Sequence, residues 1–172
     1  SFGVEPNPDL AQEAVRYAPV HQGTIENEPG AHYDVAVSFH VIEHVESPVR
    51  FVEAMASRLR PNGLVVLETP DIDSMPFRAF KSRWRQFIPD HLYFYTPPTF
   101  TRLCEEQGFA VHELRSVGKS MSLRLFLNRV GRYSKPAARA LAAISDGFGL
   151  QDRTLRLRLG DVMRVYARRR DD

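Results

Sequence analysis

The sequence has little cysteine and no long apolar run. Cys104 is the single cysteine among 172 residues, so an internal disulfide is impossible and the class of small disulfide-stapled domains is excluded. No run of about 18 apolar residues is present, which excludes a membrane-spanning helix. No basic segment followed by an apolar stretch opens the chain, which argues against a secretory signal. We therefore expect a cytoplasmic protein in which Cys104 is a plain buried thiol.

Charge is divided unevenly along the chain, although the net charge is only +2. Residues 1–114 carry nine Lys or Arg and sixteen Asp or Glu, which gives −7, whereas residues 115–172 carry fourteen and five, which gives +9. A basic half can attract nucleic acid, a membrane surface or a phosphorylated substrate. Because it contains no aromatic-rich basic patch of a nucleic-acid module, we favour a solvated face and do not expect a nucleic-acid partner.

The apolar pattern predicts one α/β domain. Hydrophobic residues make up 43% of the chain, and 172 residues suffice for one domain. Residues 35–39 and 64–67 form short apolar runs typical of strands buried on both faces of a parallel sheet. Between them, Ser47 and Pro48 start a helix with Val49, Val52, Ala56 and Leu59 on one stripe. Strand, helix and strand in succession predict a parallel sheet with crossover helices.

Flanking signals extend this pattern in both directions. A strand ends at Glu5, and Asn7 followed by Pro8 predicts a helix cap and a helix start. Further along, a helix begins near Pro97 and ends at Gly108. Additional strands are predicted at residues 20–24, 109–117 and 161–168, and one or two amphipathic helices at 120–145.

Three stretches, in this order and at these spacings, resemble the small bacterial methyltransferases related to the ubiquinone-biosynthesis O-methyltransferases. They are residues 3–7, residues 33–38 with their continuation to residue 64, and residues 84–109. The resemblance covers residues 1 to about 118. It implies an enzyme, a class I S-adenosyl-L-methionine-dependent methyltransferase, with a Rossmann-like, mostly parallel sheet of order 3-2-1-4-5-7-6 in which only strand 7 is antiparallel.

In this mapping the chain supplies strands 2 to 7 of the family, with residues 119–158 as a basic helical insertion between the last two strands. Strand 1 and its glycine-rich loop would precede residue 1, so residues 1–172 would form a single but partial domain of a longer protein. Strand 1 lies between strands 2 and 4, and its absence would leave unpaired backbone groups at open edges. A homodimer or strand-exchanged oligomer is one arrangement that would cover them.

The resemblance implies a nucleoside site on the first third of the chain. Glu5, at the C-terminal end of a strand, would accept hydrogen bonds from the ribose hydroxyls, with Pro6 and Asn7 beside the adenosine. Ile25 would form an apolar wall for the adenine, and Glu26 would accept from its amino group. The alternatives are a helix-start charge for Glu5, a helix cap for Asn7 and an ordinary polar loop for Glu26.

Ser38, Phe39 and His40 end the next strand and would lie beside the methionine moiety or the substrate. Some relatives carry Glu-x-x-Glu-His at this point and bind a divalent metal. Here His40, Glu43 and His44 are the corresponding metal candidates, with His91 approaching from the later loop. Imidazole with carboxylate suits zinc, iron or nickel better than magnesium. The alternative is that Glu43 and His44 only cap and position a helix.

His44 and His91 are the candidate catalytic residues, because imidazole titrates near neutrality and can act as a base. The alternative for His91 is a structural histidine packed on Tyr93 or Trp84. A basic amphipathic helix near Leu123–Val130 could make peripheral contact with a membrane, line a dimer or pack on the sheet.

Three functions remain open from the sequence. The first is methyl transfer to a small-molecule substrate or a lipid- or sugar-linked acceptor. The second is a non-catalytic methyltransferase-like remnant or interaction module, which the missing glycine-rich loop would explain. The third is an RNA methyltransferase, suggested by the basic insertion and the Glu43–His44 pair.

Overall fold

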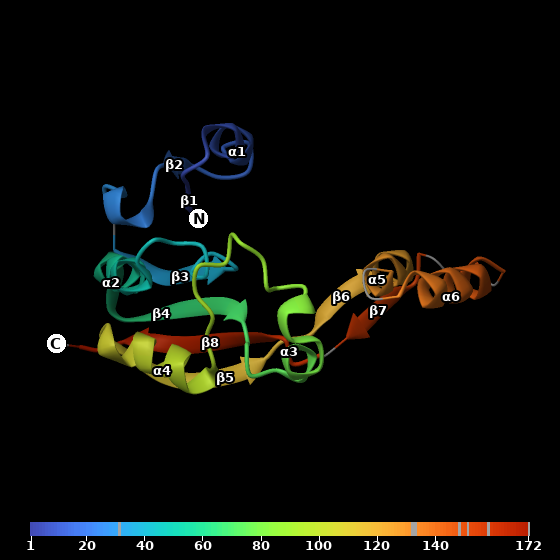
Figure 1. Cartoon of the computed structure of the whole chain (residues 1–172). Coiled ribbons are helices and arrows are strands. Elements are labelled where there is room, and N and C mark those ends of the chain that lie inside the picture. Colours follow the sequence, from blue (N-terminus) through green and yellow to red (C-terminus); the bar gives the residue numbers. More distant parts are fainter. Residues whose placement is uncertain (31, 132–133, 148, 151, 158, 172) are drawn as a thin grey trace.

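The strands form a central four-stranded sheet and two separate two-stranded ladders (Figure 1). This computed structural model describes residues 1–171 except 31, 132–133, 148, 151 and 158. The central sheet has the order β3-β4-β8-β5 and comprises β3 (Tyr33–Phe39), β4 (Leu59–Pro70), β5 (Phe109–Ser116) and β8 (Val162–Arg169). β3 and β4 pair in parallel, whereas β8 is antiparallel to β4 and β5. The predicted α/β sheet with an antiparallel last strand is confirmed.

A smaller unit at the N-terminus contains β1 (Gly3–Glu5), α1 (Pro8–Ala14), β2 (Val20–Gln22) and the 3-10 turn η1 (Ile25–Asn27). β1 and β2 pair in parallel, with Gly3 opposite Val20. The side chain of Asn7 accepts hydrogen bonds from the amides of Asp9 and Leu10, so the predicted helix cap is confirmed.

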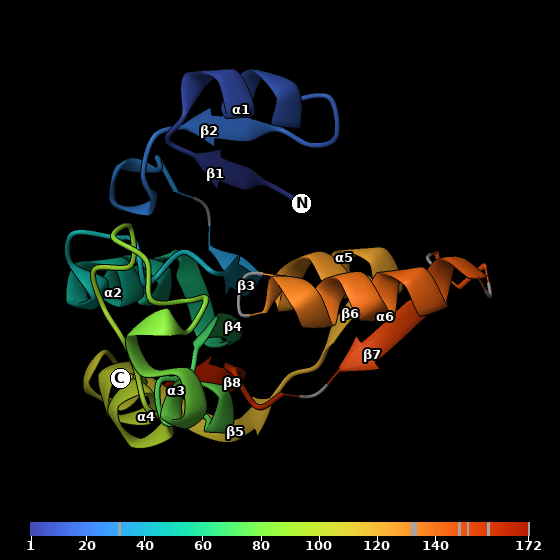
Figure 2. The ribbon, with the colours of Figure 1, turned by 45° about the vertical axis from the view of Figure 1, so that its right-hand side comes forward.

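The two units are joined without a shared strand. Within the residues that the structure describes, β1 pairs only with β2, and no strand pairs with β3 on the side away from β4. Figures 1 and 2 show the N-terminal unit on that side of β3.

Helices α2 (Pro48–Arg58) and α4 (Pro97–Glu106) cover one face of the sheet. Their buried side chains share one core cluster with β4, β5 and β8: Phe51, Val52, Met55, Phe100, Cys104, Val65, Leu67, Phe109, Met163, Val165 and Ala167. The predicted stripe of α2 is confirmed at Val52 and Leu59, which are both 0% exposed, and is wrong at Val49, which is 48% exposed. Phe51 and Met55, which the prediction left out, complete the buried face.

The other face of the sheet is open along β3. Val35, Val37 and Phe39 are between 48% and 59% exposed, so the expectation of a strand buried on both faces is wrong for β3. Among the described elements, α2 packs over the opposite face, and side chains alternate between the two faces of a strand.

The remaining elements lie outside the sheet. The short helix α3 (Met75–Phe80) and the 3-10 turn η2 (Lys81–Arg83) follow β4. Between β5 and β8 come β6 (Lys119–Ser122), α5 (Leu123–Val130), α6 (Lys135–Gly147) and β7 (Thr154–Leu157). β6 and β7 form an antiparallel ladder that the sequence did not predict. None of the helices described is long and apolar enough to cross a membrane.

The buried thiol provides a direct probe of the core. Cys104 is 0% exposed, and burial raises the pKa of its thiol to about 12. Because the thiolate is the reactive form, we expect a thiol reagent at pH 8 to label the folded protein only through unfolding. The labelling rate should therefore rise with urea in step with the loss of helical circular dichroism. Rapid labelling without urea would contradict the packing of α4.

Candidate functional site

The segment after β3 turns sharply and carries a buried carboxylate. His40 has a φ of 55°, a conformation uncommon for residues other than glycine, and its amide donates to the carbonyl of Glu68. The turn places Glu43 in the interior with 0% exposure. Buried polar groups normally have hydrogen-bond partners, and the side chain of Glu43 has two.

His40 and Thr69 are these two partners. His40 Nδ1 lies 3.2 Å from Glu43 Oε1, and the hydroxyl of Thr69 donates to Oε2 at 3.1 Å. Burial by itself raises the pKa of Glu43, but the contacts with His40 and Thr69 outweigh it, and the pKa is lowered overall. The carboxylate is therefore ionised at neutral pH in a fixed orientation.

The network continues from His40 to the last strand. His40 Nε2 lies 3.2 Å from Oε1 of Glu68, whose Oε2 accepts from Arg164 Nη2 at 2.6 Å and Nε at 2.9 Å. The Arg164 guanidinium also lies over the ring of Phe39, 5.1 Å from its centroid. Both ring nitrogens of His40 thus face carboxylates, and β3, β4 and β8 are connected at one end of the sheet.

The loop after η2 brings His91 to the same place. The amides of Leu92 and Tyr93 donate to the carbonyl of Glu43, at 2.8 Å and 3.3 Å. The rings of His44 and His91 consequently lie edge to face with centroids 4.6 Å apart. The structure therefore brings together the two histidines that the sequence named as catalytic candidates, 47 positions apart in the chain.

The two imidazoles differ in their hydrogen bonds. His44 Nδ1 lies 2.8 Å from the carbonyl oxygen of Asp90, which can only accept, so Nδ1 is the donor. Nδ1 of His91 is buried without a partner among the described residues. Burial lowers the pKa of His91, although Glu43 opposes this shift, so the ring is neutral near pH 7.

Glu43, His44 and His91 form a group that could hold a metal ion. One ligand atom from each lies within 4.8 Å of those of the other two. His40 lies outside this group, with its nitrogens directed at Glu43 and Glu68, whereas His91 belongs to it.

The predicted nucleoside residues lie on the N-terminal unit. Oε1 of Glu5 accepts from the amide of Asn7 at 2.9 Å, which directs the carboxylate to the C-terminal end of β1, next to Pro6. Ile25 packs against the core cluster, whereas Glu26 is exposed in η1.

The predicted residues at the end of β3 differ in their surroundings. Ser38 Oγ is buried and has no hydrogen-bond partner among the described residues. Phe39 is 48% exposed and lies beneath Arg164 on the open face.

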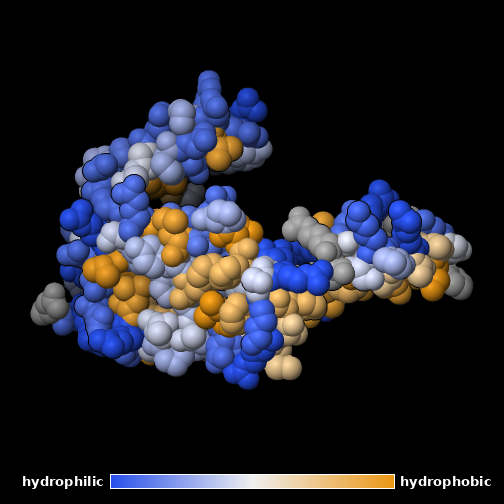
Figure 3. All heavy atoms as spheres, viewed as in Figure 1, coloured by the Kyte–Doolittle hydropathy of each residue, from blue (hydrophilic) through white to orange (hydrophobic). Residues whose placement is uncertain are grey.

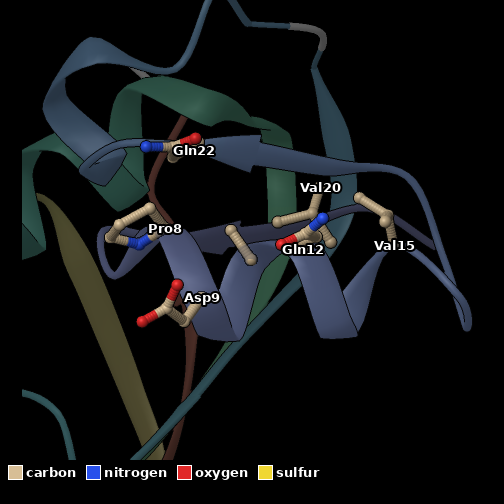
Figure 4. A pocket seen from close by; sticks show the side chains of 7 residues that line it. Pro8, Asp9, Gln12, Val15, Val20 and Gln22 are labelled. Atoms are coloured by element: carbon tan, nitrogen blue, oxygen red, sulfur yellow. The ribbon is translucent and has the colours of Figure 1, made fainter.

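A surface hollow of about 370 Å³ lies on the N-terminal unit, and one of its lining residues, Gln22, is paired with Glu5. It is formed by α1 and β2 and lined by Pro8, Asp9, Ala11, Gln12, Val15, Val20 and Gln22 (Figure 4). None of the predicted site residues lines it. Its shape alone therefore identifies no site.

The sequence analysis missed Glu68, Thr69 and Arg164. Glu68 and Thr69 end β4 as Ser38 and Phe39 end β3, so the position of polar residues at a strand end was a usable signal. Arg164 is 96 positions from Glu68 and gave no comparable signal.

Comparisons with known proteins agree on one family. A methyltransferase-domain family matches residues 1–114. Ubiquinone biosynthesis O-methyltransferases of Burkholderia pseudomallei and Burkholderia mallei are 28% identical over 131 residues, covering 63% of this chain. The match spans 56% of the relatives' own length, so the chain corresponds to about half of them.

Solved structures share the fold. A chain from a Haloferax volcanii complex between the Trm112 methyltransferase activator and a methyltransferase matches with a TM-score of 0.63 and 14% identity, covering 99% of this chain and 72% of that chain. A Thermotoga maritima SAM-dependent methyltransferase matches with a TM-score of 0.62 and 18% identity, covering 98% and 72%. At these identities the likeness establishes the fold.

Proposed function

We propose that this chain, which belongs to the methyltransferase-domain family, transfers a methyl group from S-adenosylmethionine to a small-molecule or lipid- or sugar-linked acceptor. The observation that carries this proposal is the placement of polar groups at two strand ends. Glu5 ends β1, and the unpartnered hydroxyl of Ser38 lies near the end of β3. Ligands of open α/β sheets bind at such carboxyl ends.

The residues present fit the cofactor. Among the described residues, only the amide of Asn7 bonds to the Glu5 carboxylate, through Oε1, so Oε2 remains for a ribose hydroxyl. Pro6 and Asn7 would flank the adenosine, and Ile25 and Glu26 would contact the adenine. The cofactor supplies an activated methyl group, so the chain mainly has to orient it and the acceptor.

His44 and His91 suit an acceptor that must lose a proton. Both are close together, and His91 is neutral because burial lowers its pKa. A neutral imidazole within reach can accept a proton from a hydroxyl or amine. Nearby side chains of the segment after α3 are apolar and exposed, including Phe87 at 47% and Leu92 at 57%, which favours an acceptor with an apolar part.

A calorimetric titration with S-adenosylhomocysteine tests the proposal. It should be run on this chain and on a form extended upstream, because the family's glycine-rich loop would precede residue 1. We expect the extended form to bind. If the extended form does not bind, the methyl-transfer proposal is wrong and the interaction-module alternative is favoured.

The ribose contact makes a specific prediction. We expect Glu5→Ala to weaken S-adenosylhomocysteine binding by about 1–3 kcal/mol in the extended form, since the ribose hydroxyls lose their acceptor. Glu13→Ala, in the adjoining helix α1, is the control and should leave the dissociation constant unchanged. Equal affinities of the Glu5 variant and the parent would refute the ribose assignment.

A second proposal is that Glu43, His44 and His91 bind a divalent metal that contacts the acceptor. The backbone carbonyl holding His44 Nδ1 supports it, because metal-binding histidines usually donate their other nitrogen to such a group. A bound metal would lower the pKa of an acceptor hydroxyl. Two imidazoles and one carboxylate favour zinc, iron or nickel.

Cobalt(II) absorbance tests this metal site. We expect His44→Ala to weaken cobalt binding by at least about 100-fold, because even outer-shell partners contribute about 10–100-fold. His112→Ala, an exposed histidine on β5, is the matched control and should bind as the parent does. No cobalt binding by the parent protein would leave His44 and His91 as candidate bases only.

A further inference from the structure

The segment between β5 and β8, residues 119–158, forms an arm that extends away from the central sheet (Figures 1 and 2). Its base is the β6–β7 ladder, in which Met121 lies opposite Leu155. Helix α5 follows β6 directly, and α6 packs against α5. Leu127 of α5 is 7% exposed within the arm, so the expectation that this helix packs on the sheet is wrong.

Helix α6 turns its larger apolar side chains away from the protein. The side toward α5 carries small residues: Ala138 and Ala142 are half-buried and Ser145 is 3% exposed. Leu141 and Ile144, by contrast, are 44% and 58% exposed. An ordinary surface helix has the reverse arrangement, with its larger apolar residues facing the core.

The exposed residues of α6 form a continuous apolar stripe. Ala137, Ala140, Leu141 and Ile144 are all exposed and follow the i, i+3, i+4, i+7 spacing of one helix face. Lys135 and Arg139 lie toward the opposite side of the helix by the same spacing. Figure 3 shows apolar surface at the tip of the arm, where Figure 1 places α6.

The arm is also strongly basic. Residues 119–158 contain nine Lys or Arg and two Asp, a net charge of +7. One of the two, Asp152, pairs with Arg124 at 3.3 Å. No described side chain forms an ion pair with the exposed Lys135, Arg139, Arg153 or Arg156.

We propose that the arm docks on an anionic lipid surface, with the α6 stripe among the lipid headgroups and the basic side chains contacting anionic headgroups. A helix with an apolar face and Lys or Arg on its polar face is suited to this interface. Two arms that each carry +7 repel each other, which disfavours arm-to-arm contact with a second copy. An aliphatic stripe offers RNA neither stacking nor hydrogen bonds. This inference does not depend on methyl transfer.

Vesicle co-sedimentation of the full chain tests the proposal. We expect binding to vesicles of phosphatidylcholine with 30% phosphatidylglycerol, little binding to pure phosphatidylcholine, and weakening as salt is raised. Lys135→Gln with Arg139→Gln should reduce the partition coefficient about 25-fold, at about fivefold for each basic residue. Leu141→Ser with Ile144→Ser should also reduce it, by removing the inserted apolar groups.

The matched control substitutions lie outside the arm. Arg78→Gln with Arg102→Gln removes two exposed charges, and Val49→Ser removes an exposed apolar side chain, so both should bind vesicles as the parent does. Equal loss in these controls would overturn the proposal. So would equal binding to neutral vesicles, no vesicle binding at all, or arm variants that instead convert a dimer to a monomer in sedimentation or abolish RNA binding.

Discussion

Replacing Phe100 with Ala is expected to destabilise the fold by about 3–5 kcal/mol, the largest effect among the substitutions considered. Phe100 is 0% exposed in the core between α4 and the sheet, and its ring lies 5.2 Å from that of Tyr95. Truncation removes buried apolar surface and leaves a cavity that close-packed neighbours can fill only partly. Stability would be measured as the free energy of unfolding in urea.

The control for this substitution is Phe80→Ala. Phe80 is 41% exposed in α3, and we expect a loss below about 1 kcal/mol. Similar losses for both variants would show that α4 does not pack on the sheet as described. Because α4 ends the segment that carries His91, such a result would also remove the support for the position of that histidine.

Replacing Arg164 with Met is expected to destabilise the protein by about 3 kcal/mol, the lower end of the range for leaving a buried charge without its partner. Glu68 is 8% exposed and would lose the hydrogen bonds from Nε and Nη2 of Arg164. The loss stays at the lower end because His40 still contacts Glu68 and the Arg164 side chain is itself 29% exposed.

A double variant distinguishes the cost of leaving the Glu68 charge unpaired from the cost of losing the packing of the Arg164 side chain. Glu68→Gln combined with Arg164→Met should recover part of the lost stability, since no unpaired charge remains. Arg168→Met, an exposed arginine on the same strand, is the control and should change stability by less than about 1 kcal/mol. No recovery in the double variant would mean that the network does not act through the charge of Glu68.

The sequence predicted the elements of the sheet because their signals are local. Asn7 caps α1, Pro48 and Pro97 begin helices, and Gly108, with a φ of 82°, follows α4. Each feature depends on backbone chemistry within a few residues. The antiparallel direction of β8 came from the family resemblance and could not be obtained from local signals.

The sequence predictions failed where the burial or pairing of a strand depends on residues far away in the chain. Val35 and Val37 are apolar enough for a two-sided strand, but the described elements leave one face of β3 open. The β6–β7 ladder was missed although the residues of β7 alternate between polar and apolar, because its two strands are separated in the sequence by the two arm helices. Periodicity reports which side of an element is apolar and not whether a neighbour covers it.

The candidate site was predictable only in part, for the same reason. His44 and His91 were chosen for their chemistry, and the structure brings their rings together through the bonds from Leu92 and Tyr93 to Glu43. Their roles stay predictions. That Glu68 and Arg164 orient His40 depends on pairing between strands far apart in sequence.

The crystal structure of the upstream-extended protein with S-adenosylhomocysteine tests the central claim most directly. The account predicts the ribose hydroxyls within hydrogen-bonding distance of the Glu5 carboxylate and the homocysteine sulfur beside Ser38 and His40. A nucleoside bound elsewhere, for example in the hollow between α1 and β2, with Glu5 facing solvent, would contradict it.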